Sequence, residues 1–216
     1  MKNKLYYQFA GSCFLLIFIF LGYLVKFYPE SLHNFDQAVT GSIRGPYPAL
    51  NQFFIWYTKL ANPLTVAVLA VLTSGVLFLK KYYAEAIWLF ANTAFAAGVL
   101  NPLVKLLFMR ERPTLEHLVI EHSSSFPSGH STGSVLLYGT IILLLPLFIE
   151  KKMLCRILQV ILGIIILFIG ISRVYLGVHF PSDILGGFSF GLFWLLMTYP
   201  IYQKLRFTLR FKNKQP

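Results

Sequence analysis

Three short polar clusters contain the residues of this chain whose types and spacing could do chemistry. The first places Lys105 seven residues before Arg112, which Pro113 follows. The second is Pro-Ser-Gly-His at 127–130, and the third is Ser-Arg-x5-His-x3-Asp at 172–183. Together the clusters hold three cations, two histidines and one carboxylate. Such a set suits the binding and cleavage of a phosphate ester, because cations hold the phosphate oxygens and histidine can act as nucleophile or proton donor.

The third cluster has the most specific spacing. Asp183 follows His179 by four residues. A carboxylate bonded to one imidazole nitrogen fixes the tautomer and leaves the other nitrogen free to attack. We therefore predict His179 as the nucleophile, oriented by Asp183, with the guanidinium of Arg173 available for phosphate oxygens. A helix-capping Asp183 beside a buried histidine is the alternative.

The first cluster supplies two further cations. Seven residues are about two helical turns, so Lys105 and Arg112 lie near one face if the helix continues that far. Pro113 restricts Arg112 and predicts the helix end there. A guanidinium matches phosphate oxygens with a rigid fork, whereas lysine offers a mobile point charge. A snorkelling lysine with an interfacial arginine is the alternative.

The second cluster leads into an apolar run and has the pattern of a helix start. Free N–H groups at a helix start bind anions well, so we expect Ser128 and the Gly129 amide to contact phosphate oxygens. His130 follows them and is placed to give a proton to a departing oxygen. An ordinary capped helix with an interfacial histidine is the alternative.

The rest of the chain must position these clusters, and its composition indicates a membrane protein. Of the 216 residues, 56% are hydrophobic and 12% are charged, against roughly 25% charged in a soluble domain. Apolar runs of about 20 residues match the hydrocarbon core of a bilayer. We predict one all-α domain over 1–216, a bundle of six transmembrane helices. The predicted spans cover about 6–27, 62–79, 84–108, 129–149, 154–172 and 183–203.

The basic residues predict the orientation of this bundle. The first span lacks a small-x-small cleavage site and is expected to be retained. Most of the 19 lysines and arginines, from Lys2 to Lys214, fall on the side of the two termini. The positive-inside bias predicts both termini in the cytoplasm and all three clusters at the outer face of the cell membrane. Orientation also explains the net charge of +11 better than nucleic-acid binding does.

Two outer segments leave alternatives open. Segment 28–61 has helical apolar spacing and many aromatic residues, so it is either an interfacial helix near lipid entry or a plain connector. Loop 109–126 contains Arg110, which either adds phosphate affinity or is a paired surface charge. Its other ionisable residues either bind a divalent ion or headgroup or are simply solvated: Glu111, Glu116, His117, Glu121 and His122. Within the third span, Asn92 and Asn101 are expected to form interhelical hydrogen bonds.

The three clusters, in this order and at these spacings, resemble the motifs of the type 2 phosphatidic acid phosphatase (PAP2) superfamily. The resemblance covers roughly 105–183 in its motifs and the whole chain in its six-span layout. It implies that the phosphate is held by Lys105, Arg112, Ser128, Gly129 and Arg173. It also implies that His179 forms a phosphohistidine, that Asp183 orients His179, and that His130 protonates the leaving group and then activates water. The family requires no metal ion, and we expect no cofactor.

The predicted activity is therefore metal-independent hydrolysis of a lipid phosphate or pyrophosphate. Undecaprenyl pyrophosphate, phosphatidylglycerophosphate and phosphatidic acid are the candidate substrates. Transfer of the phosphate from the same phosphohistidine to another acceptor is a second interpretation. A lipid or anion transporter is the non-enzymatic alternative, but its ionisable groups would be expected at mid-membrane rather than at one face.

Overall fold

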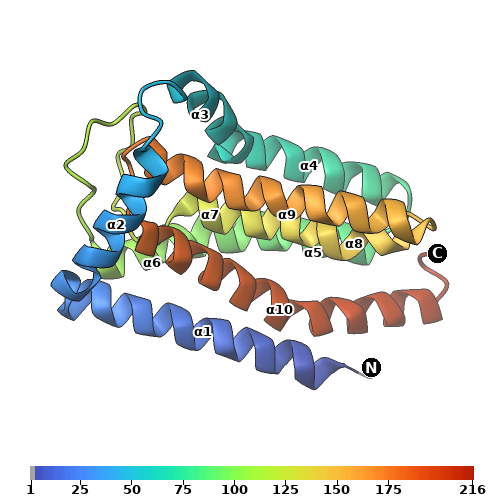
Figure 1. The fold of residues 1–216 in the computed structure, drawn as a ribbon. Coiled ribbons are helices and arrows are strands. Elements are labelled where there is room, and N and C mark those ends of the chain that lie inside the picture. Colours follow the sequence, from blue (N-terminus) through green and yellow to red (C-terminus); the bar gives the residue numbers. More distant parts are fainter. Residues whose placement is uncertain (1–2) are drawn as a thin grey trace.

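The computed structural model describes residues 3–216, and every regular element in this part of the chain is helical (Figure 1). Lys2, which contributed to the predicted orientation, lies outside the described residues. In chain order the elements are α1 Lys4–Phe27, η1 Pro29–Leu32, α2 His33–Arg44, α3 Asn51–Tyr57, η2 Thr58–Ala61, α4 Pro63–Leu79, α5 Tyr83–Ala91, η3 Asn92–Leu100, α6 Asn101–Phe108, α7 Gly129–Ser134, η4 Val135–Gly139, α8 Thr140–Leu144, η5 Leu145–Leu147, α9 Lys152–Tyr175 and α10 Pro181–Phe211. The predicted all-α class is confirmed.

The predicted apolar segments correspond to these helices. Five helices are long and apolar enough to cross a membrane, and two of them join several elements, over Tyr83–Phe108 and Gly129–Leu147. A sixth span results if α4 and the segment Asn51–Ala61, which meet at a bend of 44°, are counted together. The last helix continues to Phe211, past the predicted end at 203. The predicted end marks where the apolar residues stop. The lysine and arginine residues that follow are good helix formers, so the helix itself continues.

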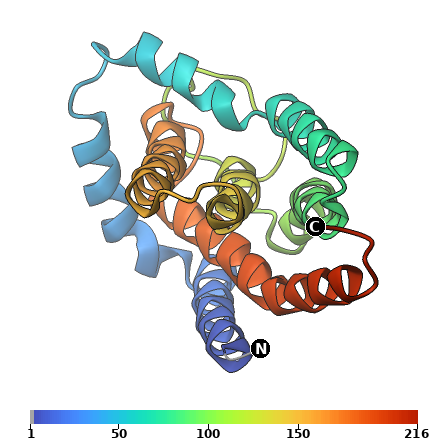
Figure 2. The ribbon, with the colours of Figure 1, turned by 90° about the vertical axis from the view of Figure 1, so that its right-hand side faces the viewer.

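The long helices run alongside one another, and the two ends of the bundle differ (Figures 1 and 2). The N- and C-terminal ends of the chain lie at one end, which we call the terminal end. The loops 109–128 and 176–180 lie at the opposite end, which we call the site end. There α2 crosses close to the end of α9 and the start of α10 (Figure 1). The fold thus brings the three clusters to one end of the bundle.

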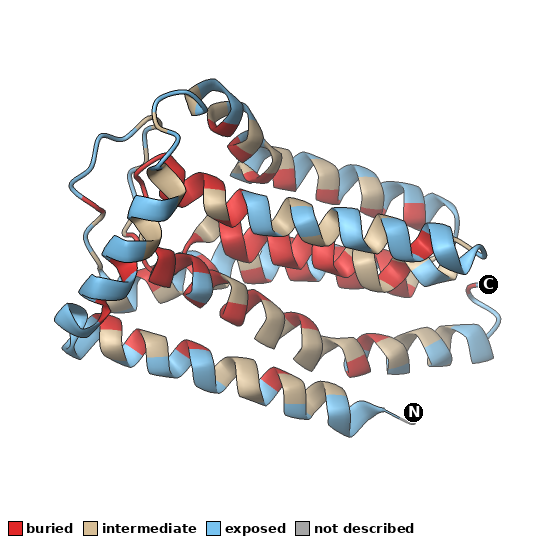
Figure 3. Cartoon of the chain, viewed as in Figure 1, coloured by how far each residue is buried: buried red, intermediate tan, exposed pale blue. Residues whose placement is uncertain are grey.

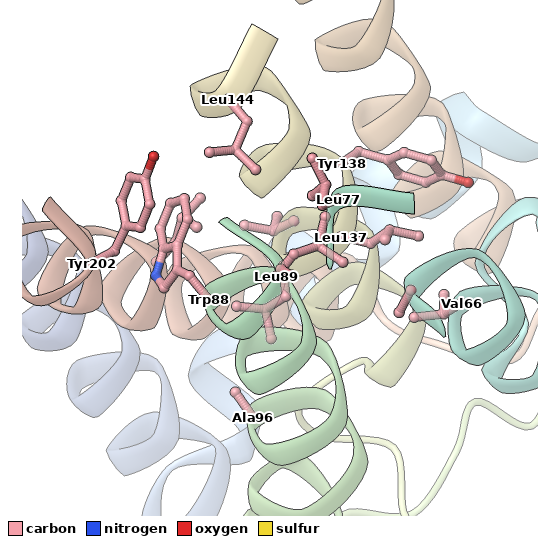
Figure 4. Packing of buried hydrophobic residues seen from close by; sticks show 14 of the residues in the cluster. Val66, Leu77, Trp88, Leu89, Ala96, Leu137, Tyr138, Leu144 and Tyr202 are labelled. Atoms are coloured by element: carbon pink, nitrogen blue, oxygen red, sulfur yellow. The ribbon is translucent and has the colours of Figure 1, made fainter. Parts of the chain in front are cut away.

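The centre of the bundle is the composite helix over 129–147. The other long helices surround it in the end-on view of Figure 2, and Figure 3 shows it buried along most of its length. Leu137 lies close to Leu89 and Tyr138 in the main apolar cluster (Figure 4). Close packing needs a glycine where α10 passes the start of α7, because a Cβ on Gly187 would lie 2.7 Å from the Ser128 carbonyl oxygen.

Polar side chains also join the core helices. Asn92 donates to Thr140 Oγ1 at 3.0 Å and accepts from Trp194 Nε1 at 3.1 Å, while Asn101 donates to Thr132 Oγ1 at 3.0 Å. These are the interhelical hydrogen bonds expected for the two asparagines. They connect the composite helix over 83–108 to the central helix and to α10, and Asn101 does so at the start of α6, four residues before Lys105.

The peripheral helix α1 presents an apolar face outward. Leu5, Phe9, Leu16 and Phe20 are exposed on it, while its inner side packs along α10. Apolar faces of this extent are rare on soluble monomers but are stable against lipid chains. The exposure pattern therefore agrees with a bundle whose sides contact a bilayer.

Segment 28–61 forms α2 and α3 with short helical turns at its two ends. The inner side of α2 carries a buried carboxylate, Asp36, rather than apolar residues alone. On α3, the Phe54 ring stacks on the Tyr175 ring with centroids 4.3 Å apart. The segment is therefore packed against the end of α9 and the start of α10. Its placement at the membrane interface stays a prediction.

Candidate active site

The site end gathers the predicted residues from five places in the chain. Lys105 comes from the last turn of α6, Arg112 from the loop that follows, and His130 from the first turn of α7. Arg173 lies near the end of α9, and α10 begins two residues after His179. Pro181 at the first position of α10 and Asp183 at the third are favourable helix-start residues, which explains why the chain turns sharply there.

His179, Asp183 and Ser125 form a buried hydrogen-bonded group. Nδ1 of His179 lies 3.3 Å from Asp183 Oδ2 and 3.2 Å from Ser125 Oγ. The Ser125 hydroxyl donates to the same carboxylate oxygen at 2.5 Å, and the Phe180 amide donates to it at 2.8 Å. An acceptor on the Nδ1 side favours the tautomer that carries its proton there. The arrangement leaves the lone pair of His179 Nε2 available.

That free nitrogen faces a cation. Arg112 Nη1 lies 3.4 Å from His179 Nε2 and donates to the Val178 carbonyl at 2.6 Å. Burial lowers the pKa of His179 to about 4, although Asp183 opposes this shift. The imidazole is therefore neutral near pH 7, as a nucleophile must be. Its Nε2 lies beside a guanidinium that could hold a phosphate oxygen.

Asp183 is itself held from outside the three clusters. Arg110 donates to Asp183 Oδ1 at 2.6 Å and to Asp36 Oδ2 at 2.9 Å. The amide and hydroxyl of Ser182 also bond to Asp36, at 2.8 and 2.7 Å. Arg110 thus bridges two buried carboxylates from α2 and α10. Arg110 is paired, as one interpretation of the sequence expected, but with two buried carboxylates rather than at the surface, and its phosphate affinity stays a prediction.

Arg173 and Lys105 approach the site from its inner side. Arg173 is 1% exposed; it donates to Thr58 Oγ1 at 2.6 Å and pairs with Glu121, and its Nε has no hydrogen-bond partner within residues 3–216. Lys105 donates to Ser123 Oγ at 3.0 Å and to the Ser124 carbonyl at 2.6 Å. Both cations are therefore held in place by the loops of the site end.

His130 and Glu121 complete the group. His130 Nε2 lies 3.0 Å from Asn62 Oδ1, which leaves Nδ1 on the side of Glu121, 4.0 Å from Oε1. Glu121 Oε2 lies 3.5 Å from Arg112 Nη2. The carboxylate of Glu121 therefore lies among Arg112, Arg173 and His130, three of the predicted site residues.

Ser128 and Gly129 have a different setting. The Ser128 hydroxyl is fully buried and accepts from the amide and hydroxyl of Ser131, at 3.3 and 3.1 Å, so it caps α7. The Ser128 amide donates to the Asp183 carbonyl at 3.1 Å. Gly129 is half-buried and begins α7. The contacts of Ser128 are those of a helix cap that ties α7 to α10, and its role in binding phosphate stays a prediction.

The comparisons with known proteins bear on this arrangement. A model of the PAP2 superfamily matches residues 59–207, which include all three clusters. The chain belongs to the PAP2 superfamily. Phosphatidylglycerophosphatase B of Bacillus subtilis is 32% identical over 207 residues, covering 92% of this chain and 97% of that protein. The undecaprenyl-diphosphatase BcrC of the same organism is 34% identical over 141 residues, covering 54% of this chain and 68% of that protein.

Solved structures agree with this PAP2 assignment. The crystal structure of a transmembrane PAP2 type phosphatidylglycerolphosphate phosphatase from Bacillus subtilis matches with a TM-score of 0.79 at 28% identity. The match covers 93% of this chain and 98% of that one. Aquifex aeolicus LpxE shares the fold, with a TM-score of 0.55 at 23% identity. Together with the apolar helices, the likeness establishes a multi-pass membrane protein of PAP2 type.

Proposed function

We propose that this chain is a membrane lipid phosphatase that cleaves a phosphate ester or anhydride through a phosphohistidine on His179. The observation that carries the proposal is the state of the imidazole: Nδ1 is bonded to Asp183 and Ser125, while neutral Nε2 lies 3.4 Å from Arg112. The relatives named above, a phosphatidylglycerophosphatase and an undecaprenyl-diphosphatase, support a lipid phosphate as substrate.

In the first step His179 Nε2 attacks phosphorus, and the bond from phosphorus to the lipid oxygen breaks. Arg112, Arg173 and Lys105 hold the phosphate oxygens, where fixed cations stabilise the negative charge that spreads in the transition state. The leaving oxygen takes a proton from Nδ1 of the His130 imidazolium, whose Nε2 keeps its own proton, hydrogen-bonded to Asn62 Oδ1. The products of this step are the dephosphorylated lipid and phosphohistidine. Ser128 and the Gly129 amide are proposed to assist in holding the phosphate.

In the second step the phosphohistidine is hydrolysed. Nδ1 of His130, now without its proton, accepts one from water as the water oxygen attacks phosphorus. The nitrogen–phosphorus bond breaks, which returns neutral His179 and releases inorganic phosphate. Asp183 balances the positive charge that the His179 ring carries while it is phosphorylated.

We further propose that the site end faces outward and the terminal end faces the cytoplasm. The terminal end carries the basic residues at the start of α1 and at the end of α10. The positive-inside bias favours the cytoplasm for such residues. An outward site suits undecaprenyl pyrophosphate, which is released on that side. Phosphatidylglycerophosphate and phosphatidic acid are the other two substrates to be compared.

Phosphate release by the detergent-purified protein tests the activity. We expect release in EDTA from at least one of the three lipids, and a His179→Ala protein that folds but releases none. His33→Ala, at an exposed position on α2, is the matched control and should keep full activity. Labelled substrate should leave an acid-labile phosphate on the wild-type protein. A fully active His179→Ala variant would disprove the proposed nucleophile.

A further inference from the structure

Glu121 makes the contacts that a bound phosphate would need. Its Oε1 pairs with Arg173 and lies 4.0 Å from His130 Nδ1, and its Oε2 lies 3.5 Å from Arg112 Nη2. These three partners are the residues proposed above to hold the phosphate and to protonate the leaving group. A carboxylate and a phosphate offer the same kind of oxygen to a guanidinium fork. Glu121 therefore takes the place of the substrate anion.

The charges of the site explain why an internal anion is stable there. Three cations face the site, and the other carboxylate, Asp183, is already bonded to Arg110, Ser125 and His179. A buried arginine without a counter-charge is strongly destabilising, and the Arg173 side chain is 1% exposed. Glu121 supplies that counter-charge in the absence of substrate. A phosphate cannot use the same donors beside the carboxylate, because like charges in contact repel one another.

Glu121 also lies on a part of the chain that is weakly held. The Leu118 amide donates to the Leu176 carbonyl at 3.1 Å, and the Ser123 carbonyl accepts from Arg112 Nε at 2.9 Å. Between these two anchors, residues 119–122 make no backbone–backbone hydrogen bond to any described residue. Within this segment Val119 packs against the apolar cluster around Tyr175, whereas Ile120, next to Glu121, is 84% exposed. Segments with few buried contacts and few backbone hydrogen bonds open at low free energy.

We propose that Glu121 is an internal competitor at the phosphate site, which sets a threshold of affinity that a terminal phosphate passes and a singly charged phosphodiester does not. The inference rests on the proposed function. A phosphodiester headgroup, the commonest anion of a phospholipid bilayer, carries one negative charge. A terminal phosphate carries about 1.5 to 2 near pH 7. The anion with more charge binds three cations more strongly and can displace the carboxylate.

Competition of this kind has a quantitative signature. A competitor that occupies the site lowers the apparent affinity of every anion by the same factor, namely the fraction of molecules in which the site is open. Weakly bound phosphodiesters then stay unbound at their membrane concentration, whereas a terminal phosphate still binds. Removing the charge of Glu121 should tighten the binding of both classes of anion equally, by about tenfold, a typical size for linked equilibria.

The experiment compares wild type, Glu121→Gln and Glu111→Gln in a neutral detergent. Glu111 lies on the same loop and is exposed, so its variant changes the same charge away from the site. Binding of inorganic phosphate is measured by calorimetry, and micelles containing phosphatidylglycerol supply the phosphodiester as inhibitor of phosphate release. We expect Glu121→Gln to lower the Kd of phosphate and the inhibition constant of phosphatidylglycerol by the same factor, and Glu111→Gln to change neither.

Weaker or unchanged phosphate binding in Glu121→Gln would overturn the proposal, because Glu121 would then only hold Arg173 in place. Glu121→Asp keeps the charge but withdraws it by one methylene, and should give a smaller shift in the same direction. If Glu121→Gln does not fold, the phosphate affinity of Glu121→Asp tests the proposed competition instead. Calorimetry needs no turnover, so a wild-type protein that binds phosphate but hydrolyses no lipid would refute the proposed function and leave the test of Glu121 intact.

Discussion

The two ends of the bundle each contain a carboxylate in contact with arginine, and they use that pair differently. At the terminal end, Glu85 on α5 lies 3.0 Å from Arg206 Nε, accepts from Tyr202 at 2.9 Å and accepts from Gln215 at 3.3 Å. At the site end, Glu121 lies on a loop among Arg112 and Arg173, with Lys105 nearby.

The difference lies in the balance of charge and in the element that carries the carboxylate. Glu85 sits on a helix, and its oxygens are satisfied by fixed partners that join α5 to α10 and the C-terminal residues. At the site end the cations outnumber the acids, and one acid lies on a weakly held segment. A balanced network stabilises the fold, whereas a network with surplus charge can exchange its internal anion for a ligand. The same pair of residue types therefore does not indicate the same role.

The largest expected effect is on kcat, and it distinguishes Asp183 at the site end from Glu85 at the terminal end. We expect Asp183→Asn to lower kcat by about 10³–10⁴-fold, because the amide no longer fixes the tautomer of His179. Glu85→Gln should leave kcat within about twofold but lower the unfolding free energy by about 1–3 kcal/mol, because a buried charged hydrogen bond is lost. Kinetics and thermal unfolding of both variants test the contrast. Equal losses of activity would show that the terminal end also serves catalysis.

A smaller loss is expected from the residue that supports Asp183. Replacing Arg110 by Met keeps the length of the side chain but removes the bridge between Asp36 and Asp183. We expect kcat to fall about 10–100-fold with little change in KM, the usual size for a group that orients a catalytic one. Arg110→Lys should recover part of the loss. A raised KM at unchanged kcat would mean that Arg110 binds the phosphate, as the sequence alone allowed.

The last prediction concerns pH. The His179 pKa of about 4 lies below the ordinary value of 6.5, so the folded protein keeps this imidazole neutral in mildly acidic solution. Activity limited by His179 should therefore persist well below pH 6.5 and fall tenfold per unit only below about pH 4. Between those values only the unfolded chain takes up the proton, so the unfolding free energy falls as pH decreases, by about 3 kcal/mol in total. A rate profile that declines near pH 6.5 would contradict this.

The sequence predicted the six apolar segments and the residues of the three clusters because periodicity and spacing are local signals. It could not predict the partners of those residues. Asp36 contacts Ser182 across 146 positions, and no pattern in segment 28–61 marks a buried acid. Ser125 lies in loop 109–126, where no pattern marks the bond from its hydroxyl to Asp183. Glu121 could not be told apart from the other ionisable residues of its loop, because only the folded structure shows that it lies next to Arg173.

The position of all three clusters at a single end of the bundle limits where substrate can come from. Such an enzyme draws on one leaflet of the bilayer, the leaflet at its site end, and leaves its lipid product there. Lipid phosphates made in the other leaflet become available only after their headgroups have crossed the hydrocarbon core. The steady rate in a cell would then be governed by the supply of lipid across the membrane as much as by chemistry at the histidine.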